Sequence, residues 1–305
     1  MTLVCIQRNS KKMRLSSIDI GSNAIRQLIV EIKPDGAWKV LKKHRETIRL
    51  GTDVFDDGLI HVNTQKRLIL AFKRMARLNR KFKVDRSLAF ATSAFRDAKN
   101  RKLILSAIYK LSRIKIKVIS GRKEAELIRR AVQKSIGLDD RRCLLIDIGG
   151  GSVELTHLQK NKIFYSKSFK WGMVRTITES KVQAKEPKKI LIEKLAENEK
   201  LMPKGRFEIA IGTGGNLDAL GKLKLVALKK GPNTLITVAE LEKIYKIFTK
   251  TPIAARAVKF KLKADRVDVI EPAMFLTLSL MKKYKISKLK IPGTGLKEGA
   301  ILSLL

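Results

Sequence analysis

Two short loops place an aspartate just before glycine and small polar side chains, each directly after an apolar run. Residues 147–152 read Asp-Ile-Gly-Gly-Gly-Ser, and residues 19–23 read Asp-Ile-Gly-Ser-Asn. Glycines after a strand let the backbone turn tightly and approach a ligand, and successive N–H groups then form an anion-binding nest. We therefore expect two phosphate-binding loops, formed by Gly21, Ser22 and Asn23 and by Gly149, Gly150, Gly151 and Ser152.

The aspartates of these loops, Asp19 and Asp147, stand at strand ends, where a carboxylate can hold a metal ion or its water shell. One such loop is a weak signal, because glycine turns after strands are common. Two copies at matching places of a duplicated fold are far more specific. Facing each other, they would clamp a phosphate chain in a cleft between two domains.

The elements that must position these loops follow one order twice. In the first part, strands are expected at 14–21, 24–33 and 38–50, a helix at 62–82, a strand from 87 that ends in a polar loop by 100, a helix at 101–114 and a strand at 115–120. In the second, a helix is expected at 124–136, strands at 142–149, 153–159 and 162–169, and helical segments near 185–202, 216–223, 237–250 and 271–285. Strands are also expected before the glycines at 212–215 and near 288–291.

The repeated order predicts an internal duplication with an α/β fold. We place the domains at residues 1–122 and 123–305 and expect the terminal helix, within 293–305, to pack back on the first domain. Residues 1–12 are expected to form a frayed extension, with Met13 as the biological start.

Composition limits the class of protein. The formal net charge is +38, from 66 Lys and Arg against 28 Asp and Glu, so polyanions are attractive partners. Such an excess of basic residues can equally be a compositional bias shared by a whole proteome. Cys5 and Cys143 are too few for a disulfide framework, and no apolar run predicts a membrane span or a signal peptide, so we expect a cytoplasmic protein without membrane partners.

Seven stretches, in this order and spacing, resemble the exopolyphosphatase/guanosine pentaphosphate phosphatase (Ppx/GppA) family. They are IDIGSNAIRQLI, RLGTDVFDDGLI, ATSAFRDAKNR, VISGRKEAELI, LLIDIGGGSVEL, IGTGGNLDALGKL and PGTGLKEGAIL. The resemblance runs from about residue 15 to residue 305 and is to the short, two-domain members. It implies two tandem actin-like ATPase (ribonuclease H-like) domains with an interdomain cleft that closes around substrate.

The resemblance also implies roles for single residues. Glu124, in Ser-Gly-Arg-Lys-Glu-Ala, takes the place of the catalytic glutamate that activates water; from spacing alone it would be an ordinary glutamate at a helix N-terminus. Arg96 takes the place of a phosphate-binding arginine, and Arg26 is a weaker candidate. Asp19, Asp147 and Glu154 are implied to hold Mg²⁺ or another divalent ion.

Gly212, Gly214 and Gly215 match the loop that lies near adenosine in ATP-using relatives. We expect a structural remnant here, with contact to a guanosine as the alternative.

Two charges near Glu124 depart from the family pattern. Lys123 replaces a glutamate, and Glu126 stands where an arginine is frequent. We interpret Lys123 as a cation that favours the ionised form of Glu124 and attracts polyanionic substrate.

The leading hypothesis is a Mg²⁺-dependent exopolyphosphatase that removes terminal phosphate from inorganic polyphosphate. The alternatives are a guanosine pentaphosphate (pppGpp) 5′-phosphohydrolase, an ATP-dependent kinase or actin-like ATPase, and a non-catalytic polyanion-binding protein. No nucleic-acid-binding motif is visible, so no specific nucleic acid is predicted, and a homodimer is left open.

Overall fold

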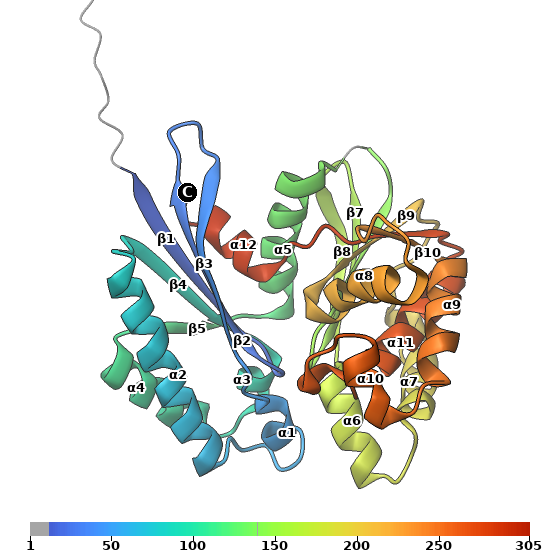
Figure 1. The fold of residues 1–305 in the computed structure, drawn as a ribbon, viewed down its shortest axis with the longest axis horizontal. Helices are drawn as coiled ribbons and strands as arrows, with labels where there is room; N and C mark the ends of the chain where they lie inside the picture. The colour runs from blue at the N-terminus through green and yellow to red at the C-terminus, as the bar shows by residue number, and fades with distance from the viewer. Residues whose placement is uncertain (1–11, 139) are drawn as a thin grey trace, which may run out of the picture.

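The computed structural model describes residues 12–138 and 140–305 of the 305-residue chain (Figure 1). The predicted extension at 1–12, apart from Lys12, and Cys5 lie outside the described residues. No helix in this described part is long and apolar enough to cross a membrane.

The first unit is a five-stranded sheet with helices. Its strands are β1 (Met13–Ile20), β2 (Ile25–Ile32), β3 (Trp38–Glu46), β4 (Arg86–Ala91) and β5 (Ile116–Val118). Its helices are α1 (Leu50–Val54), α2 (Val62–Lys81), α3 (Ser93–Asp97) and α4 (Arg101–Ser112), and α5 (Gly121–Ile136) follows.

The second unit is larger. Its strands are β6 (Cys143–Ile148), β7 (Val153–Gln159), β8 (Lys162–Phe169), β9 (Ile209–Thr213), β10 (Leu235–Thr237) and β11 (Lys288–Lys290). Its helices are α6 (Met173–Val182), α7 (Pro187–Glu197), η1 (Glu199–Leu201), α8 (Gly214–Leu228), α9 (Val238–Thr249), α10 (Ile253–Lys259), η2 (Ala264–Arg266), α11 (Ile270–Lys283) and α12 (Leu296–Leu302).

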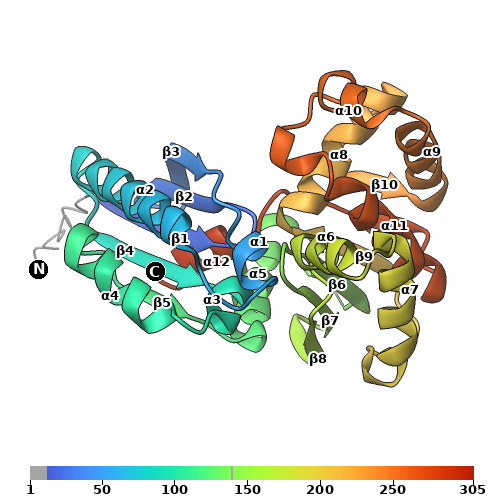
Figure 2. The ribbon, with the colours of Figure 1, turned by 90° about the horizontal axis from the view of Figure 1, so that it is seen from below.

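The two sheets share one strand order. The first runs β3-β2-β1-β4-β5, and the second runs β8-β7-β6-β9-β11 with β10 added at its edge. In both, the first two strand pairs along the chain are antiparallel, and the first strand pairs in parallel with the fourth. This order confirms the predicted α/β fold of two related units, which lie side by side in Figures 1 and 2.

Several local features differ from the expectation. The short strand β10 and the helices α6 and α10 lie where no element was expected. Helix α3 occupies a stretch assigned to strand and loop, and α1 begins at the last residue of an expected strand. The start of α9 follows from its sequence, because Thr237 and Glu240 cap each other reciprocally at 2.9 and 3.2 Å.

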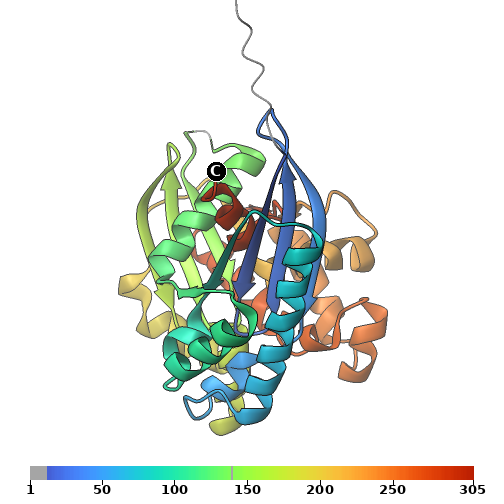
Figure 3. The same ribbon diagram turned by 90° about the vertical axis from the view of Figure 1, so that its left-hand side faces the viewer.

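Helices α5 and α12 pack together between the sheets (Figures 1 and 3). On one side, Ile301 and Leu304 pack against Leu15, Leu28 and Val30 of the first sheet. On the other, Leu127 and Ile128 of α5 belong to a cluster with Leu145 and Ile211 of the second sheet. These apolar contacts on both sides hold the two units against each other over the rim of the cleft.

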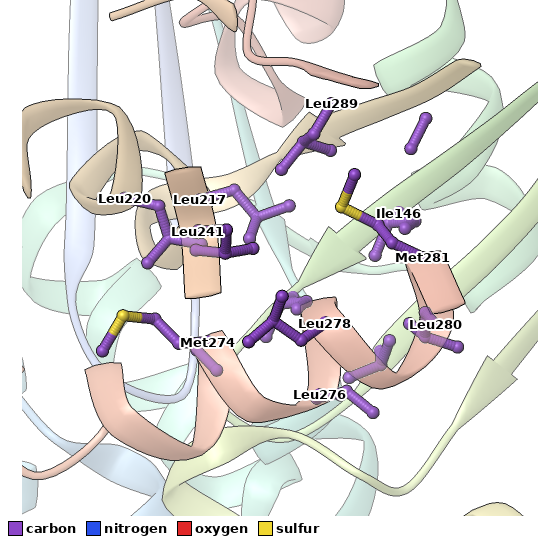
Figure 4. Close-up of a cluster of buried hydrophobic side chains, with 14 of the residues drawn as sticks. Ile146, Leu217, Leu220, Leu241, Met274, Leu276, Leu278, Leu280, Met281 and Leu289 are labelled. Carbon is purple, nitrogen blue, oxygen red and sulfur yellow. The ribbon is translucent and has the colours of Figure 1, made fainter. Parts of the chain in front are cut away.

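The main core of the second unit lies between its sheet and helices α8, α9 and α11. Figure 4 shows the close packing of Leu217 and Leu220 of α8, Leu241 of α9, and Met274 and Met281 of α11. Full burial of each such side chain contributes roughly 1.5–3 kcal/mol, so this core anchors the strand ends that carry the second loop.

Candidate active site

The two predicted loops have the same backbone turn and line one cavity. The N–H of Gly21 donates to the carbonyl of Ala24 at 3.2 Å, and at the matching position the N–H of Gly149 donates to the carbonyl of Ser152 at 3.0 Å. Both loops line a cavity of about 80 Å³, which has room for several water molecules.

Both loops offer free backbone donors. Within the described residues, the N–H groups of Ser22, Asn23, Gly150 and Gly151 donate no hydrogen bond to the protein. A Cβ added to Gly150 would lie 3.1 Å from Cβ of Ser22 and 3.2 Å from the backbone nitrogen of Asn23, so the loops touch. Adjacent unpaired N–H groups from two facing turns can receive phosphate oxygens.

Three carboxylates from different elements meet beside these loops. Asp147 and Glu154 lie directly opposite each other in the β6–β7 ladder, and Glu124 comes from the first turn of α5. One carboxylate oxygen of each lies within 4.8 Å of the others. Ser120 caps α5 by accepting from the N–H of Lys123 at 3.3 Å, which fixes the turn that carries Glu124.

Arg96 connects this group to the second loop. It lies in the last turn of α3, and its guanidinium donates to Glu124 Oε2 at 3.1 Å and to Ser152 Oγ at 3.3 Å. Its Nη2 lies 3.9 Å from Glu154 Oε1. One arginine therefore faces two buried carboxylates, and net negative charge remains.

Burial dominates the electrostatics of the three acids. It raises the pKa of Glu124 well above its usual value; the negative charges of Glu154 and Asp147 add to this, while Arg96 opposes it. Burial also raises the pKa of Asp147, with Glu154 and then Asp19 adding to the effect. The pKa of Glu154 is raised by burial despite hydrogen bonds from Ser168, at 2.7 Å, and Ser152. Crowded, buried acids of this kind are typical of catalytic or metal-binding sites.

The donor set fits a hard divalent cation. All three groups supply carboxylate oxygens, the ligands that Mg²⁺, Mn²⁺ and Ca²⁺ prefer, and their surplus negative charge calls for a cation. Among the described residues, this is the one group of three or more His, Cys, Asp or Glu side chains whose ligand atoms lie close enough together to share a metal ion.

Asp19 lies apart from this group. It lines the same cavity, but its Oδ2 accepts from Arg26 at 3.3 Å. Burial raises its pKa, and Arg26 and Lys297 lower it. Of the four acids implied by the resemblance, the structure therefore brings three together and pairs the fourth with a cation.

The glycines of the GTGG stretch at 212–215, the third loop, lie partly at the cavity and partly in the core. Gly214 and Gly215 line the cavity, whereas Gly212 lies inside β9, where a Cβ would meet Leu217 at 2.6 Å. Gly214 has φ +84°, and a Cβ there would lie 2.2 Å from Asp147 Oδ1. Only glycine permits this turn and this approach.

Sequence reasoning missed several polar residues of the site. Arg266, on η2, lines the cavity and donates to Asn216 Oδ1 at 2.6 Å, and burial lowers its pKa to about 10. Asn216 in turn donates to the carbonyl of Ile148 at 2.9 Å. Asn216 follows the GTGG glycines and could have been found there, but Arg266 belongs to no motif.

Ion pairs across the cleft hold the two units together. Asp265 of the second unit accepts from Asn23 at 3.1 Å and pairs with Arg45 of β3, and Asp268 lies 2.8 Å from Arg49. Arg175 of α6 pairs with Asp97 and donates to the carbonyl of Gly151 at 2.9 Å. Polar contacts therefore join the two units at the cleft, beside the apolar contact of Phe55 with the cores of both units.

The interpretation of Lys123 is not supported by its surroundings. Its Nζ lies 3.0 Å from Glu126 on the exposed side of α5, and it is absent from the groups that shift the pKa of Glu124. Lys123 and Glu126, the two residues that depart from the family pattern, therefore form an ion pair with each other, three positions apart on α5.

Comparisons with known proteins agree with this geometry. Residues 28–305 match the model of the Ppx/GppA phosphatase family. The chain is 26% identical over 304 residues to exopolyphosphatase 1 of Mycobacterium tuberculosis, covering 96% of this chain and 88% of that protein. It is 34% identical over 171 residues to the bifunctional 3-dehydroquinate synthase/phosphatase of Fusobacterium nucleatum, covering 54% of this chain and 26% of that protein.

Solved structures share the whole architecture. An exopolyphosphatase from Cytophaga hutchinsonii superposes with a TM-score of 0.86 at 25% identity, covering 96% of this chain and 97% of that one. The Aquifex aeolicus member of the Ppx/GppA family superposes with a TM-score of 0.79 at 26% identity, covering 96% and 98%.

Proposed function

Because this chain belongs to the Ppx/GppA phosphatase family, we propose that it is a metal-dependent exopolyphosphatase that hydrolyses the terminal phosphoanhydride bond of inorganic polyphosphate. One observation carries the proposal: three buried carboxylates meet beside two facing loops with unpaired N–H groups. The relatives named exopolyphosphatase that match nearly the whole chain support the choice of substrate.

In this proposal, Glu124 holds and deprotonates the attacking water. Its raised pKa makes it a stronger base than an exposed glutamate, and Arg96 at 3.1 Å fixes the direction of its carboxylate. The water oxygen bonds to the terminal phosphorus while the bond from that phosphorus to the bridging oxygen breaks. Glu124 takes the proton, and the shortened chain leaves with the electron pair on its new terminal oxygen.

The loops and arginines hold the substrate. The N–H groups of Ser22, Asn23, Gly150 and Gly151 would bind oxygens of the terminal phosphates, and Arg96 and Arg266 would offset the charge that develops as the bridging bond breaks. Ser152, bonded to Arg96, keeps that guanidinium at the second loop.

We propose Mg²⁺ as the cation and Asp147 and Glu154 as its ligands, with Glu124 adjacent. Bound there, a divalent cation supplies charge neutralisation for the phosphate oxygens. Asp19, paired with Arg26, is proposed to orient water at the edge of this site.

The alternative substrate is pppGpp. Gly214 and Gly215 line the cavity, so a nucleotide could reach the third loop. The same carboxylates would then remove its 5′-terminal phosphate. The gathered carboxylates disfavour a purely binding function, because three buried acids weaken rather than strengthen the binding of a polyanion. A cytoplasmic location and a homodimer stay predictions.

The test measures phosphate release by the purified wild-type protein with Mg²⁺, from long-chain polyphosphate, pppGpp and ATP in parallel. We expect kcat/KM to be highest for polyphosphate. Release from pppGpp alone would move the function to the nucleotide, and turnover of ATP alone would favour an ATPase. No release from any of the three, with polyphosphate still bound, would contradict catalysis.

A further inference from the structure

A second hollow continues from the carboxylate cavity along the surface. It has a volume of about 240 Å³, and Arg26, Gly215 and Arg266 line both spaces. Its cationic lining consists of Arg26, Arg45, Lys222, Lys261, Lys263 and Arg266, against one acid, Asp218. We call this hollow the basic groove.

Three lysines of the basic groove are free to bind an anion. Lys222 of α8, and Lys261 and Lys263 in the loop after α10, are exposed and form no ion pair with any carboxylate of the described residues. The neighbouring acid Asp265 is already engaged by Arg45 and Asn23. The positive charge of these three lysines is therefore not balanced by an ion pair within the described residues.

A hollow on another side of the cavity provides a comparison. It has a similar volume, about 250 Å³, and meets the cavity at Val174. Its lining holds two cations, Arg49 and Lys181, and two acids, Asp56 and Asp268, so its charges cancel. A linear polyanion that leaves the cavity is attracted to the basic groove and not to this second hollow.

We propose that the part of a polyphosphate chain beyond the reacting phosphate lies in the basic groove, on Lys222, Lys261 and Lys263, and that these lysines set the preference for long chains. This inference rests on the proposed function. The described residues that line the groove include no aromatic side chain on which a base could stack, which favours a phosphate polymer over a nucleotide.

The test compares two triple variants with equal changes in net charge. The groove variant is Lys222→Glu/Lys261→Glu/Lys263→Glu. The control is Lys66→Glu/Lys102→Glu/Lys110→Glu, at exposed lysines outside both hollows that lie on α2 and α4. For each, kcat/KM is measured for long-chain polyphosphate and for the shortest polyphosphate that the wild type hydrolyses, over a range of salt concentrations. Thermal unfolding checks that both variants fold.

The groove variant should lower the ratio of long-chain to short-chain kcat/KM by about tenfold or more and make its salt dependence shallower, while the control changes the ratio less than about twofold. Equal shifts in both variants, or an unchanged ratio in the groove variant, would overturn the proposal while leaving the hydrolase assignment intact. Single-stranded DNA that competes as well as polyphosphate, at equal phosphate concentration, would also overturn it. A wild type inactive on every polyphosphate would instead refute the proposed function itself.

Discussion

The two hairpins at the cleft share one backbone and differ in charge. In the β1–β2 hairpin, Asp19 faces Arg26 across the ladder; in the β6–β7 hairpin, Asp147 faces Glu154 at the matching position. The turns are closed by the same hydrogen bond, from the first glycine to the carbonyl three residues on. The two hairpins therefore differ at one facing position: Asp19 lies opposite a base, Arg26, whereas Asp147 lies opposite a second acid, Glu154.

This difference in charge suits the β1–β2 and β6–β7 hairpins to different roles. Burial raises the pKa of Asp19, but the ion pair with Arg26 opposes this and balances its charge within the first hairpin. Burial and then the charge of Glu154 raise the pKa of Asp147, and Glu124 joins the same group, so the second hairpin calls for an external cation. In the proposed function both hairpins bind phosphate, and this difference in charge places the metal ligands on the second hairpin.

The largest effect is expected when the second hairpin loses its extra acid. Glu154→Gln keeps the shape and a partner for Ser168, but removes a negative charge from the three carboxylates. We expect kcat/KM for polyphosphate to fall roughly 100- to 1,000-fold and Mg²⁺ binding to weaken, because the charge that holds the ion is reduced. Phosphate release and calorimetric Mg²⁺ titration measure both; full activity with unchanged Mg²⁺ affinity would contradict the assignment.

A smaller loss is expected when the first hairpin loses its cation. Arg26→Ala removes the partner of Asp19 and one cation of the cavity, so KM for polyphosphate should rise about tenfold. Among the described residues, Arg26 forms no ion pair with the three carboxylates, and its charge competes with a cation beside Asp147, so Mg²⁺ affinity should not fall when it is removed. Steady-state kinetics and the same titration distinguish the hairpins, and equal loss of Mg²⁺ affinity in both variants would erase their proposed difference.

The pH dependence of metal binding tests the same asymmetry. The folded pKa values of Glu124, Asp147 and Glu154 are raised, so without metal their burial costs stability as pH rises through those values. Mg²⁺ must displace the protons they retain, so its stabilising effect should grow as the pH rises toward these raised pKa values. Each displaced proton changes the binding free energy by about 1.4 kcal/mol per pH unit. Melting temperatures with and without Mg²⁺ give the difference, and a pH-independent shift would argue against these ligands.

The smallest effect is expected at the charge pair beside Glu124. Lys123→Glu breaks the exposed ion pair with Glu126, which should cost no more than about 0.5 kcal/mol of the free energy of unfolding. Activity should remain within about twofold of the wild type, because Lys123 does not contact the three carboxylates. A large change in kcat would show that the neighbouring helix, and not the hairpins alone, sets the charge of the site.

Much of this arrangement could be predicted from local patterns. Glycine loops after apolar runs located both hairpin turns, and the resemblance to a family drew attention to Glu124, Arg96 and Glu154. The pairing of Asp147 with Glu154 follows once a tight turn is assumed, because strand register is then fixed.

What the sequence did not reveal depends on distant contacts. Arg266 reaches the cavity from a short 3-10 helix with no signature, and the ion pairs of Asp265 and Asp268 join residues more than 200 positions apart from their partners. Lys123 was interpreted through its neighbour in sequence, Glu124, and its ion pair with Glu126 on the same helix could not be read from that interpretation. Gly212 was grouped with its loop, although its position in β9 places it in the core.

The most direct test of the account is the activity of Glu124→Gln on long-chain polyphosphate with saturating Mg²⁺, with Mg²⁺ binding measured on the same sample. We predict that kcat falls about 10²- to 10⁴-fold, as for loss of a general base, while the folded protein still binds polyphosphate and Mg²⁺. Phosphate release at the wild-type rate would contradict the role of Glu124 and, with it, the proposal that the three buried carboxylates form the catalytic centre.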